Sequence, residues 1–297
     1  MSQALCSSEW VDREVYPFES KYINLTTGKM HYIDEGQGDV LLLVHGTPVW
    51  SFIYRNQIKV LSKHFRVIAP DHIGFGLSSR PKNFAYTPKA QSSNLAEFIE
   101  KLSLDSFHVV VHDFGGPIGL NYATDHPERI KSLSVLNTWM WSLENDKDLI
   151  RISDFLDGWI GRFLYKNLNA SAKYLLPKGF SNSELLTKDI HEQYTSAFPD
   201  SNGRHATWVF ARELKLSGEW FQSIFEKRKN LYAIPMQIIW GMKDELIKQH
   251  HLNTWRETMA DHPNIRYLEI EDSGHFIQEE APERLNEALQ EFISLND

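Results

Sequence analysis

The sequence predicts an α/β protein with a mostly parallel central sheet flanked by helices. The alternation of two kinds of segment along the chain indicates this fold class. Short apolar runs rich in β-branched residues alternate with segments of helical spacing, as expected for a sheet covered on both faces. This alternation stops near residue 138 and resumes near residue 231. The 297 residues are 42% hydrophobic and 24% charged, which provides for a large core.

Each element follows from its local pattern. Gly36 and Gly38 separate the first two apolar runs, which we expect to form a hairpin or strand pair. Pro70 ends the third run. The expected strands cover residues 30–34, 40–44, 65–69, 107–111, 132–136, 235–240 and 265–270, and the expected helices cover residues 51–62, 89–102, 117–126, 250–259 and 282–295.

The middle of the chain differs from its two ends. Residues 138–230 show helix-like segments and many aromatic residues but no convincing buried strand. The sequence therefore predicts an α/β core formed by residues 1–137 and 231–297, interrupted by an inserted helical cap of residues 138–230.

The sequence around Asp113 is the most informative stretch of the chain. Val111-His-Asp-Phe-Gly-Gly116 follows an apolar β-branched run and precedes a segment of helical spacing. A strand, a sharp turn with small residues and a helix form the context of a nucleophile elbow, which usually carries Ser. A carboxylate attacks an amide poorly but can displace a leaving group from saturated carbon. Asp113 therefore predicts covalent attack on carbon.

Two further residues are candidate partners of Asp113. In α/β-hydrolase folds the acid and then the histidine follow the nucleophile in the chain. His275, in Asp272-Ser-Gly-His-Phe276, lies in a loop after a strand and before the last helix. Asp244 follows another strand and can orient His275 through its second ring nitrogen. The alternative for Asp244 is a helix N-cap, and one residue can do both.

The loop His45-Gly-Thr-Pro48 directly follows a strand. An oxyanion needs preorganised donors, and the backbone N–H groups of Thr47 and Phe114 are the candidates. A purely structural tight turn explains the same residues.

Other signals do not predict a cofactor. The loop of residues 71–79 resembles the start of a dinucleotide site but lacks the third glycine and runs into Arg80-Pro81, so we expect a structural turn. His250 and His251 are adjacent, and we expect them to point in different directions on a helix. We therefore expect no metal and no nucleotide cofactor.

Composition indicates which partners and which cellular compartment to expect for the protein. A net charge of −8 gives no electrostatic reason to bind nucleic acid. The single cysteine, Cys6, excludes a disulfide framework and fits a reducing compartment. No signal-peptide core or membrane-length apolar run is found, so we expect a cytoplasmic monomer or homodimer that acts on a small apolar organic substrate and water without contacting a membrane.

Together these motifs resemble the haloalkane dehalogenase and epoxide hydrolase branch of the α/β-hydrolases, and are most similar to haloalkane dehalogenases. The resemblance covers nearly the whole chain and implies a two-step reaction. Asp113 would form an alkyl-enzyme ester, and His275, held by Asp244, would activate the water that hydrolyses it. Trp50, Phe180 and Phe276 would line the substrate pocket.

The chain also departs from this branch. Dehalogenases usually carry a tryptophan after the nucleophile and often an asparagine in the His-Gly-x-Pro motif, where this chain has Phe114 and Thr47. Asn137 holds the place of the acid in some dehalogenases. Epoxide hydrolysis is the alternative, and it would need two cap tyrosines from Tyr165, Tyr174 and Tyr194. Ester or lactone hydrolysis and an inactive hydrolase-fold binding protein are further alternatives.

Overall fold

The computed structural model describes residues 8–296, so Cys6 lies outside the described residues. Eight strands form one sheet in the order β1-β2-β4-β3-β5-β6-β7-β8. From β4 to β8 every neighbouring pair is parallel, whereas β2 pairs antiparallel with both β1 and β4. The strands are β1 (Lys21–Asn24), β2 (Lys29–Glu35), β3 (Val40–Val44), β4 (Arg66–Pro70), β5 (Phe107–His112), β6 (Ile130–Leu136), β7 (Met236–Gly241) and β8 (Ile265–Ile270).

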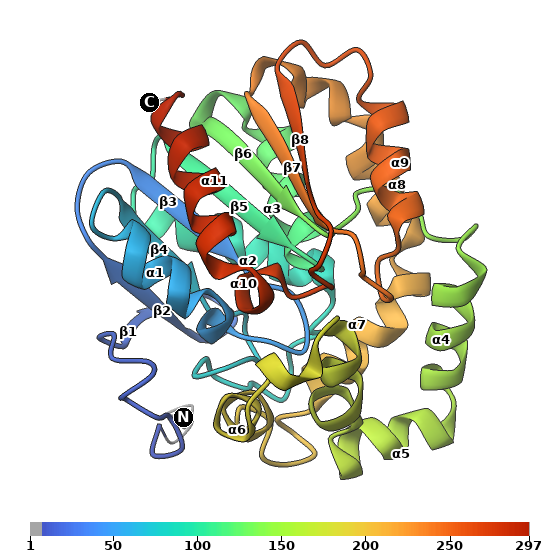
Figure 1. Cartoon of the computed structure of the whole chain (residues 1–297). Coiled ribbons are helices and arrows are strands. Elements are labelled where there is room, and N and C mark those ends of the chain that lie inside the picture. The colour runs from blue at the N-terminus through green and yellow to red at the C-terminus, as the bar shows by residue number, and fades with distance from the viewer. Residues whose placement is uncertain (1–7, 297) are drawn as a thin grey trace.

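Helices cover both faces of the sheet, which confirms the predicted fold class. On one face α1 (Arg55–Leu61) packs against α11 (Pro282–Ser294), next to the short α10 (Ile277–Glu280). On the other face α2 (Pro88–Lys101) and α8 (Gly218–Glu226) pack against α3 (Gly115–Asp125) (Figure 1). The helix α9 (Gln249–Thr258) connects β7 to β8.

The central strand β5 positions the candidate site. All six of its residues are buried, as expected for a strand with neighbours on both edges and helices on both faces. Val111 pairs in parallel with Val44 of β3 and with Val135 of β6. The carboxyl ends of β3, β5, β6 and β7 therefore meet at one edge of the sheet, where open α/β sheets bind ligands.

The predicted pairing of the first two strands is wrong. β4 lies between β2 and β3, antiparallel to β2 and parallel to β3. The chain does reverse at Gly36, whose φ of 83° and close approach to the backbone oxygen of Phe65 require glycine. The reversal brings β3 near β2 without pairing the two strands, and β4 lies between them. The half-exposed edge strand β1 was not predicted.

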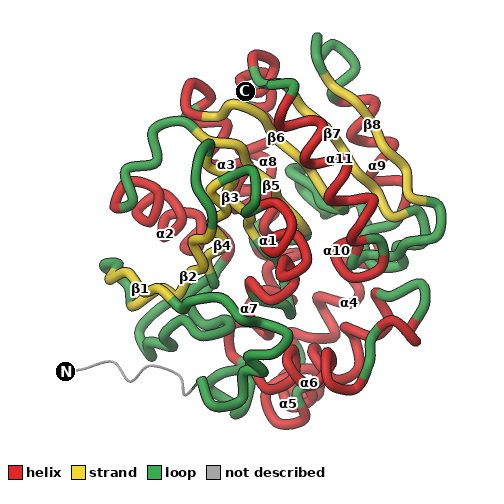
Figure 2. The backbone as a smooth tube through the Cα atoms, turned by 60° about the vertical axis from the view of Figure 1, so that its left-hand side comes forward, coloured by secondary structure: helices red, strands yellow, loops and turns green. Residues whose placement is uncertain are grey.

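Between β6 and β7 the described chain contains helices and no strand. These helices gather beyond the carboxyl ends of the strands, as Figures 1 and 2 show from two sides. α4 packs on α5 and α7, whereas α8 returns to the core and packs on α3. The division into core and cap stays a prediction. The helices of this region that precede α8 are α4 (Lys147–Asp157), α5 (Trp159–Leu168), α6 (Lys188–Ser196) and α7 (His205–Leu216).

Across residues 8–296 we find no helix with both the length and the apolar character needed to cross a membrane.

Candidate active site

Asp113 occupies a sharp turn between β5 and α3. Its backbone has a φ of 53°, which non-glycine residues rarely adopt and which is typical of functional sites. The small residues after it are required by close packing. A side chain at Gly115 would lie 2.3 Å from the backbone oxygen of Val44, and one at Gly116 would lie 1.8 Å from Thr138 Oγ1. The local geometry is therefore that of a nucleophile elbow.

The loop after β3 holds the Asp113 carboxylate from one side. The Thr47 N–H donates to Asp113 Oδ1 at 2.8 Å. Gly46 allows this approach, because a Cβ there would lie 2.2 Å from the same oxygen. Thr138 donates its hydroxyl to the backbone oxygen of Asp113 and so anchors the turn from the β6 side.

His275 faces Asp113 and Asp244 with its two ring nitrogens. Nε2 lies 3.6 Å from Asp113 Oδ2, an ion-pair distance longer than a hydrogen bond, and Nδ1 lies 2.7 Å from Asp244 Oδ2. Complete burial alone would lower the pKa of His275, but the negative charges and hydrogen bonds of Asp244 and Asp113 outweigh it and raise the pKa to about 10. The imidazole is therefore positively charged between two carboxylates at neutral pH.

Asp244 does not cap a helix, because α9 begins only at Gln249 with Lys248 at its N-cap, and its catalytic role stays a prediction. Its Oδ1 accepts from the backbone N–H groups of Leu246 and Ile247 at 2.7 and 2.9 Å, which fixes the turn after β7 in the manner of a cap. Its Oδ2 contacts His275 and also accepts from Asn137 Nδ2 at 2.7 Å. The carboxylate is buried, and both of its oxygens are hydrogen-bonded.

Asn137 and His112 support this arrangement, and neither role was predicted. Asn137 has a φ of 31°, and its side-chain oxygen accepts from the Gly241 N–H at 2.8 Å. His112 donates from Nε2 to the backbone oxygen of His275 at 2.9 Å. Burial and then the nearby charge of His275 lower the pKa of His112 to about 3, so it stays neutral. The sequence offers one signal for these roles: Asn137 directly follows β6, and His112 is the last residue of β5.

The Phe114 ring lies among aromatic side chains. Its centroid is 5.0 Å from Trp139 in an edge-on arrangement and 4.7 Å from Phe210. The phenyl ring has no N–H to donate. Trp139 Nε1 and Thr47 Oγ1 are among the buried donor atoms near this turn that have no hydrogen-bond partner within the described residues.

The three expected pocket residues have different ring neighbours. Trp50 is fully buried in an aromatic cluster with Tyr16 and Phe52, and its Nε1 donates to the backbone oxygen of Gln193 at 3.3 Å. These contacts show a packing role for its indole ring.

Phe276 and Phe180 lie beside the candidate histidine. The Phe276 ring packs edge-on against His275 at 4.8 Å, and Phe180 packs on Phe276 at 5.2 Å. A pocket role for these two residues stays a prediction.

Tyr165, one of the three tyrosines considered from the sequence, is buried and interacts with the charge of Asp113. Burial and then the negative charge of Asp113 raise the pKa of its hydroxyl. Tyr194 instead donates to Glu279, which also holds Arg55, and Tyr174 is 60% exposed. The epoxide alternative, which needs two tyrosines, therefore finds one candidate here.

Two other sequence expectations concern residues outside this site. The turn of residues 71–79 folds around the buried Asp71 carboxylate, which accepts from the Ser51 and Leu77 N–H groups. The expectation that His250 and His251 diverge is wrong. Their ring centroids are 4.2 Å apart, and both rings reach the same carboxylate, because they lie in the first turn of α9, facing the loop that carries Asp146.

Comparison with known proteins identifies the family. Residues 39–282 match the model of the alpha/beta hydrolase fold, so the chain belongs to this family. A cis-3-alkyl-4-alkyloxetan-2-one decarboxylase of Shewanella oneidensis is 32% identical over 94% of this chain and 89% of its own length. Haloalkane dehalogenase 2 of Mycobacterium bovis is 30% identical over 94% of this chain and 96% of its own length.

A solved structure agrees with this placement. The haloalkane dehalogenase DbeA from Bradyrhizobium elkani has a TM-score of 0.83 at 22% identity and covers 93% of this chain and 98% of its own. Within the family, the chain is a hydrolase of the haloalkane dehalogenase and epoxide hydrolase branch.

Proposed function

We propose that this hydrolase uses Asp113 to open a carbon–oxygen bond of a small, strained, apolar ring, through a covalent ester that a His275-activated water hydrolyses. The observation that carries the proposal is the arrangement around Asp113: a carboxylate at an elbow, with a histidine–carboxylate pair on one side and the Thr47 N–H on the other. A carboxylate nucleophile forms an ester only with an electrophilic carbon.

The charges of the site favour a two-step order. Before reaction, His275 is a cation between Asp113 and Asp244 and cannot accept a proton. When Asp113 becomes an ester, it loses its negative charge, and one of the groups that raises the pKa of His275 disappears. The imidazolium can then release its Nε2 proton to solvent. The neutral imidazole next takes a proton from the attacking water, while Asp244 holds its Nδ1 and stabilises the cation that forms again. The histidine thus becomes a base only after the ester has formed.

Water then attacks the carbonyl carbon of the Asp113 ester. The negative charge that develops there falls on an ester oxygen, and the Thr47 N–H already donates to a carboxylate oxygen at 2.8 Å. The Phe114 N–H at the start of α3 is the proposed second donor. Collapse of the intermediate releases the product alcohol and restores the Asp113 carboxylate.

The leaving group distinguishes the candidate reactions. A departing halide needs polarised N–H donors, and Phe114 supplies none from its side chain. An opening epoxide needs a proton donor, and the Tyr165 hydroxyl lies within the field of Asp113. A four-membered lactone, the substrate class in the name of the Shewanella oneidensis relative, departs as a carboxylate. The lactone needs neither a halide donor nor a pair of tyrosines, so a strained oxygen ring of this kind is the substrate class that we propose.

Haloalkane hydrolysis is the second candidate, and Trp139 favours it. Its indole Nε1 is buried without a hydrogen-bond partner, and its ring lies against Phe114. An indole N–H is a donor suited to a halide. Trp139 would then replace the tryptophan that dehalogenases usually carry after the nucleophile.

A substrate panel tests the proposal. The wild type is assayed with a terminal epoxide, a cis-3,4-dialkyl β-lactone and a 1-bromoalkane of similar length, following ring opening or bromide release. We expect turnover of at least one oxygen ring. Tyr165→Phe should slow epoxide opening by roughly 100- to 10,000-fold, the usual contribution of a general acid. Its effect on bromide release should be small. Rapid bromide release without turnover of either ring would contradict the proposed leaving group.

A further inference from the structure

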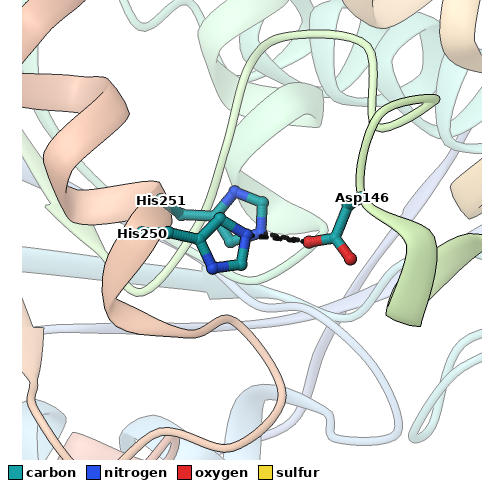
Figure 3. Close-up of side chains that lie close together, drawn as sticks. All are labelled: Asp146, His250 and His251. Carbon is teal, nitrogen blue, oxygen red and sulfur yellow. Dashed lines mark hydrogen bonds and ion pairs between the residues drawn. The ribbon is translucent and has the colours of Figure 1, made fainter.

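A second group of titratable side chains lies at the junction of the cap region and the core. Asp146 precedes α4 and caps it, because its Oδ1 accepts from the backbone N–H groups of Asp148 and Leu149. Its other oxygen, Oδ2, lies 2.9 Å from His250 Nε2 and 3.0 Å from His251 Nε2. Figure 3 shows both imidazole rings of α9 turned toward this one carboxylate.

The three ligand atoms converge as they would around a metal ion. All lie within 4.8 Å of one another. In a tetrahedral zinc site with bonds of about 2.0–2.2 Å, neighbouring ligand atoms are about 3.4 Å apart. The two Nε2···Oδ2 distances would therefore have to lengthen by only a few tenths of an ångström. The two histidine nitrogens lie within 4.8 Å of each other and would approach one another around the ion.

The donor set selects the class of metal. Two imidazole nitrogens and one carboxylate oxygen suit zinc and similar transition metals, whereas Mg²⁺ and Ca²⁺ prefer oxygen ligands. The side chain of His250 is 55% exposed, which leaves solvent access for a water as the fourth ligand. Lys248, which directly precedes α9, forms its ion pair with Asp148 at 2.8 Å.

The histidines are already held in place without a metal. His251 is 2% exposed, and its ring stacks on Trp141 with an interplanar angle of 19°. Asp146 is fixed through its capping bonds. A ligand set that is ordered before binding loses little side-chain entropy when the ion arrives.

We propose that Asp146, His250 and His251 form a zinc site that fastens the start of α4 to the first turn of α9. The site is separate from the catalytic groups and does not depend on the function proposed for them. Zinc binding at this site would nonetheless restrain the loop that carries Asp244. The loop that carries Asp244 leads directly into α9. A zinc ion would tie the entry to the cap region to the element that follows the candidate acid.

Zinc titration of the full chain without a histidine tag tests this proposal. The protein is treated with EDTA, dialysed, and titrated with ZnCl₂ by calorimetry in a buffer that does not chelate metals. Thermal unfolding is then recorded with EDTA, excess Zn²⁺ or excess Mg²⁺. We expect saturable binding of one zinc ion per chain and a rise in Tm of a few degrees with Zn²⁺ only, because the ion binds the folded state.

Variants separate this site from other surface histidines. His250→Gln removes an exposed ligand, and Asp146→Asn removes the charged ligand but keeps a residue that can cap α4. Both should unfold near the wild-type Tm in EDTA and lose the zinc response. His126→Gln is the matched control, since His126 lies 3.7 Å from Glu128 on the surface and should not matter. Absence of zinc uptake by the wild type, or equal uptake by His250→Gln, would overturn the proposal.

Discussion

Replacement of Asn137 gives the most quantitative prediction. Its side chain donates to Asp244 Oδ2 at 2.7 Å and accepts from the Gly241 N–H at 2.8 Å, in a position with no solvent exposure. A hydrogen bond to a charged group contributes about 1.5–3 kcal/mol, and a buried N–H left without an acceptor costs about 1–3 kcal/mol. Asn137→Ala should therefore lower the free energy of unfolding by about 2.5–6 kcal/mol.

Backbone conformation supplies the control for this prediction. Asn137 has a φ of 31°, which asparagine and glycine tolerate better than alanine. Asn137→Gly removes the same hydrogen bonds without the strain, so it should be less destabilised than Asn137→Ala by about 1 kcal/mol. Urea unfolding measures both differences. A loss below 1 kcal/mol in both variants would refute the assigned role of the Asn137 side chain.

Three further predictions concern the candidate site. Gly46→Ala places a Cβ 2.2 Å from Asp113 Oδ1 and should lower kcat by roughly 100-fold or more, the effect of a misplaced reacting group. An unchanged kcat would show that the loop moves to accommodate the methyl group without displacing Asp113. Phe114→Trp should cost about 1–3 kcal/mol of stability from overpacking against Trp139 and should increase bromide release if a side-chain donor is what limits it; urea unfolding and a halide assay test the two effects separately. The pKa of His275, raised to about 10, means that its ion pairs stabilise the fold below about pH 6.5 and are lost as the pH rises toward 10. The Tm advantage of wild type over His275→Gln should accordingly shrink between pH 6 and pH 10, and a constant difference would contradict the charged imidazole.

The parts of the fold predicted from sequence are those with local signals. The strand, elbow and helix around Asp113 lie within one continuous stretch, where an apolar run, small residues and helical spacing follow one another. Asp244 and His275 each follow a strand, so a parallel sheet brings both to the edge where Asp113 lies. Chain order was then enough to select them as candidates.

The missed features depend on contacts between distant parts of the chain. β4 separates β2 from β3, and no local pattern states which strand fills a gap in the sheet. Asn137 and Asp244 are 107 positions apart, and an asparagine at a strand end gives no sign of its partner. The same holds for Asp146 and His251, 105 positions apart. Helix periodicity alone predicts that adjacent histidines diverge, whereas the loop that precedes α4 brings one carboxylate to both.

Mass analysis of the His275→Gln variant tests the central claim of covalent attack by Asp113. The variant keeps the nucleophile but lacks the base that activates water, so hydrolysis of the ester should slow by roughly 100- to 10,000-fold while its formation continues. After incubation with a ring substrate that the wild type turns over, the intact mass should rise by that of one substrate molecule. Peptide mapping should locate the addition on Asp113, and Asp113→Ala should show no addition. An unmodified His275→Gln variant, together with substantial turnover by Asp113→Ala, would contradict covalent catalysis by this aspartate.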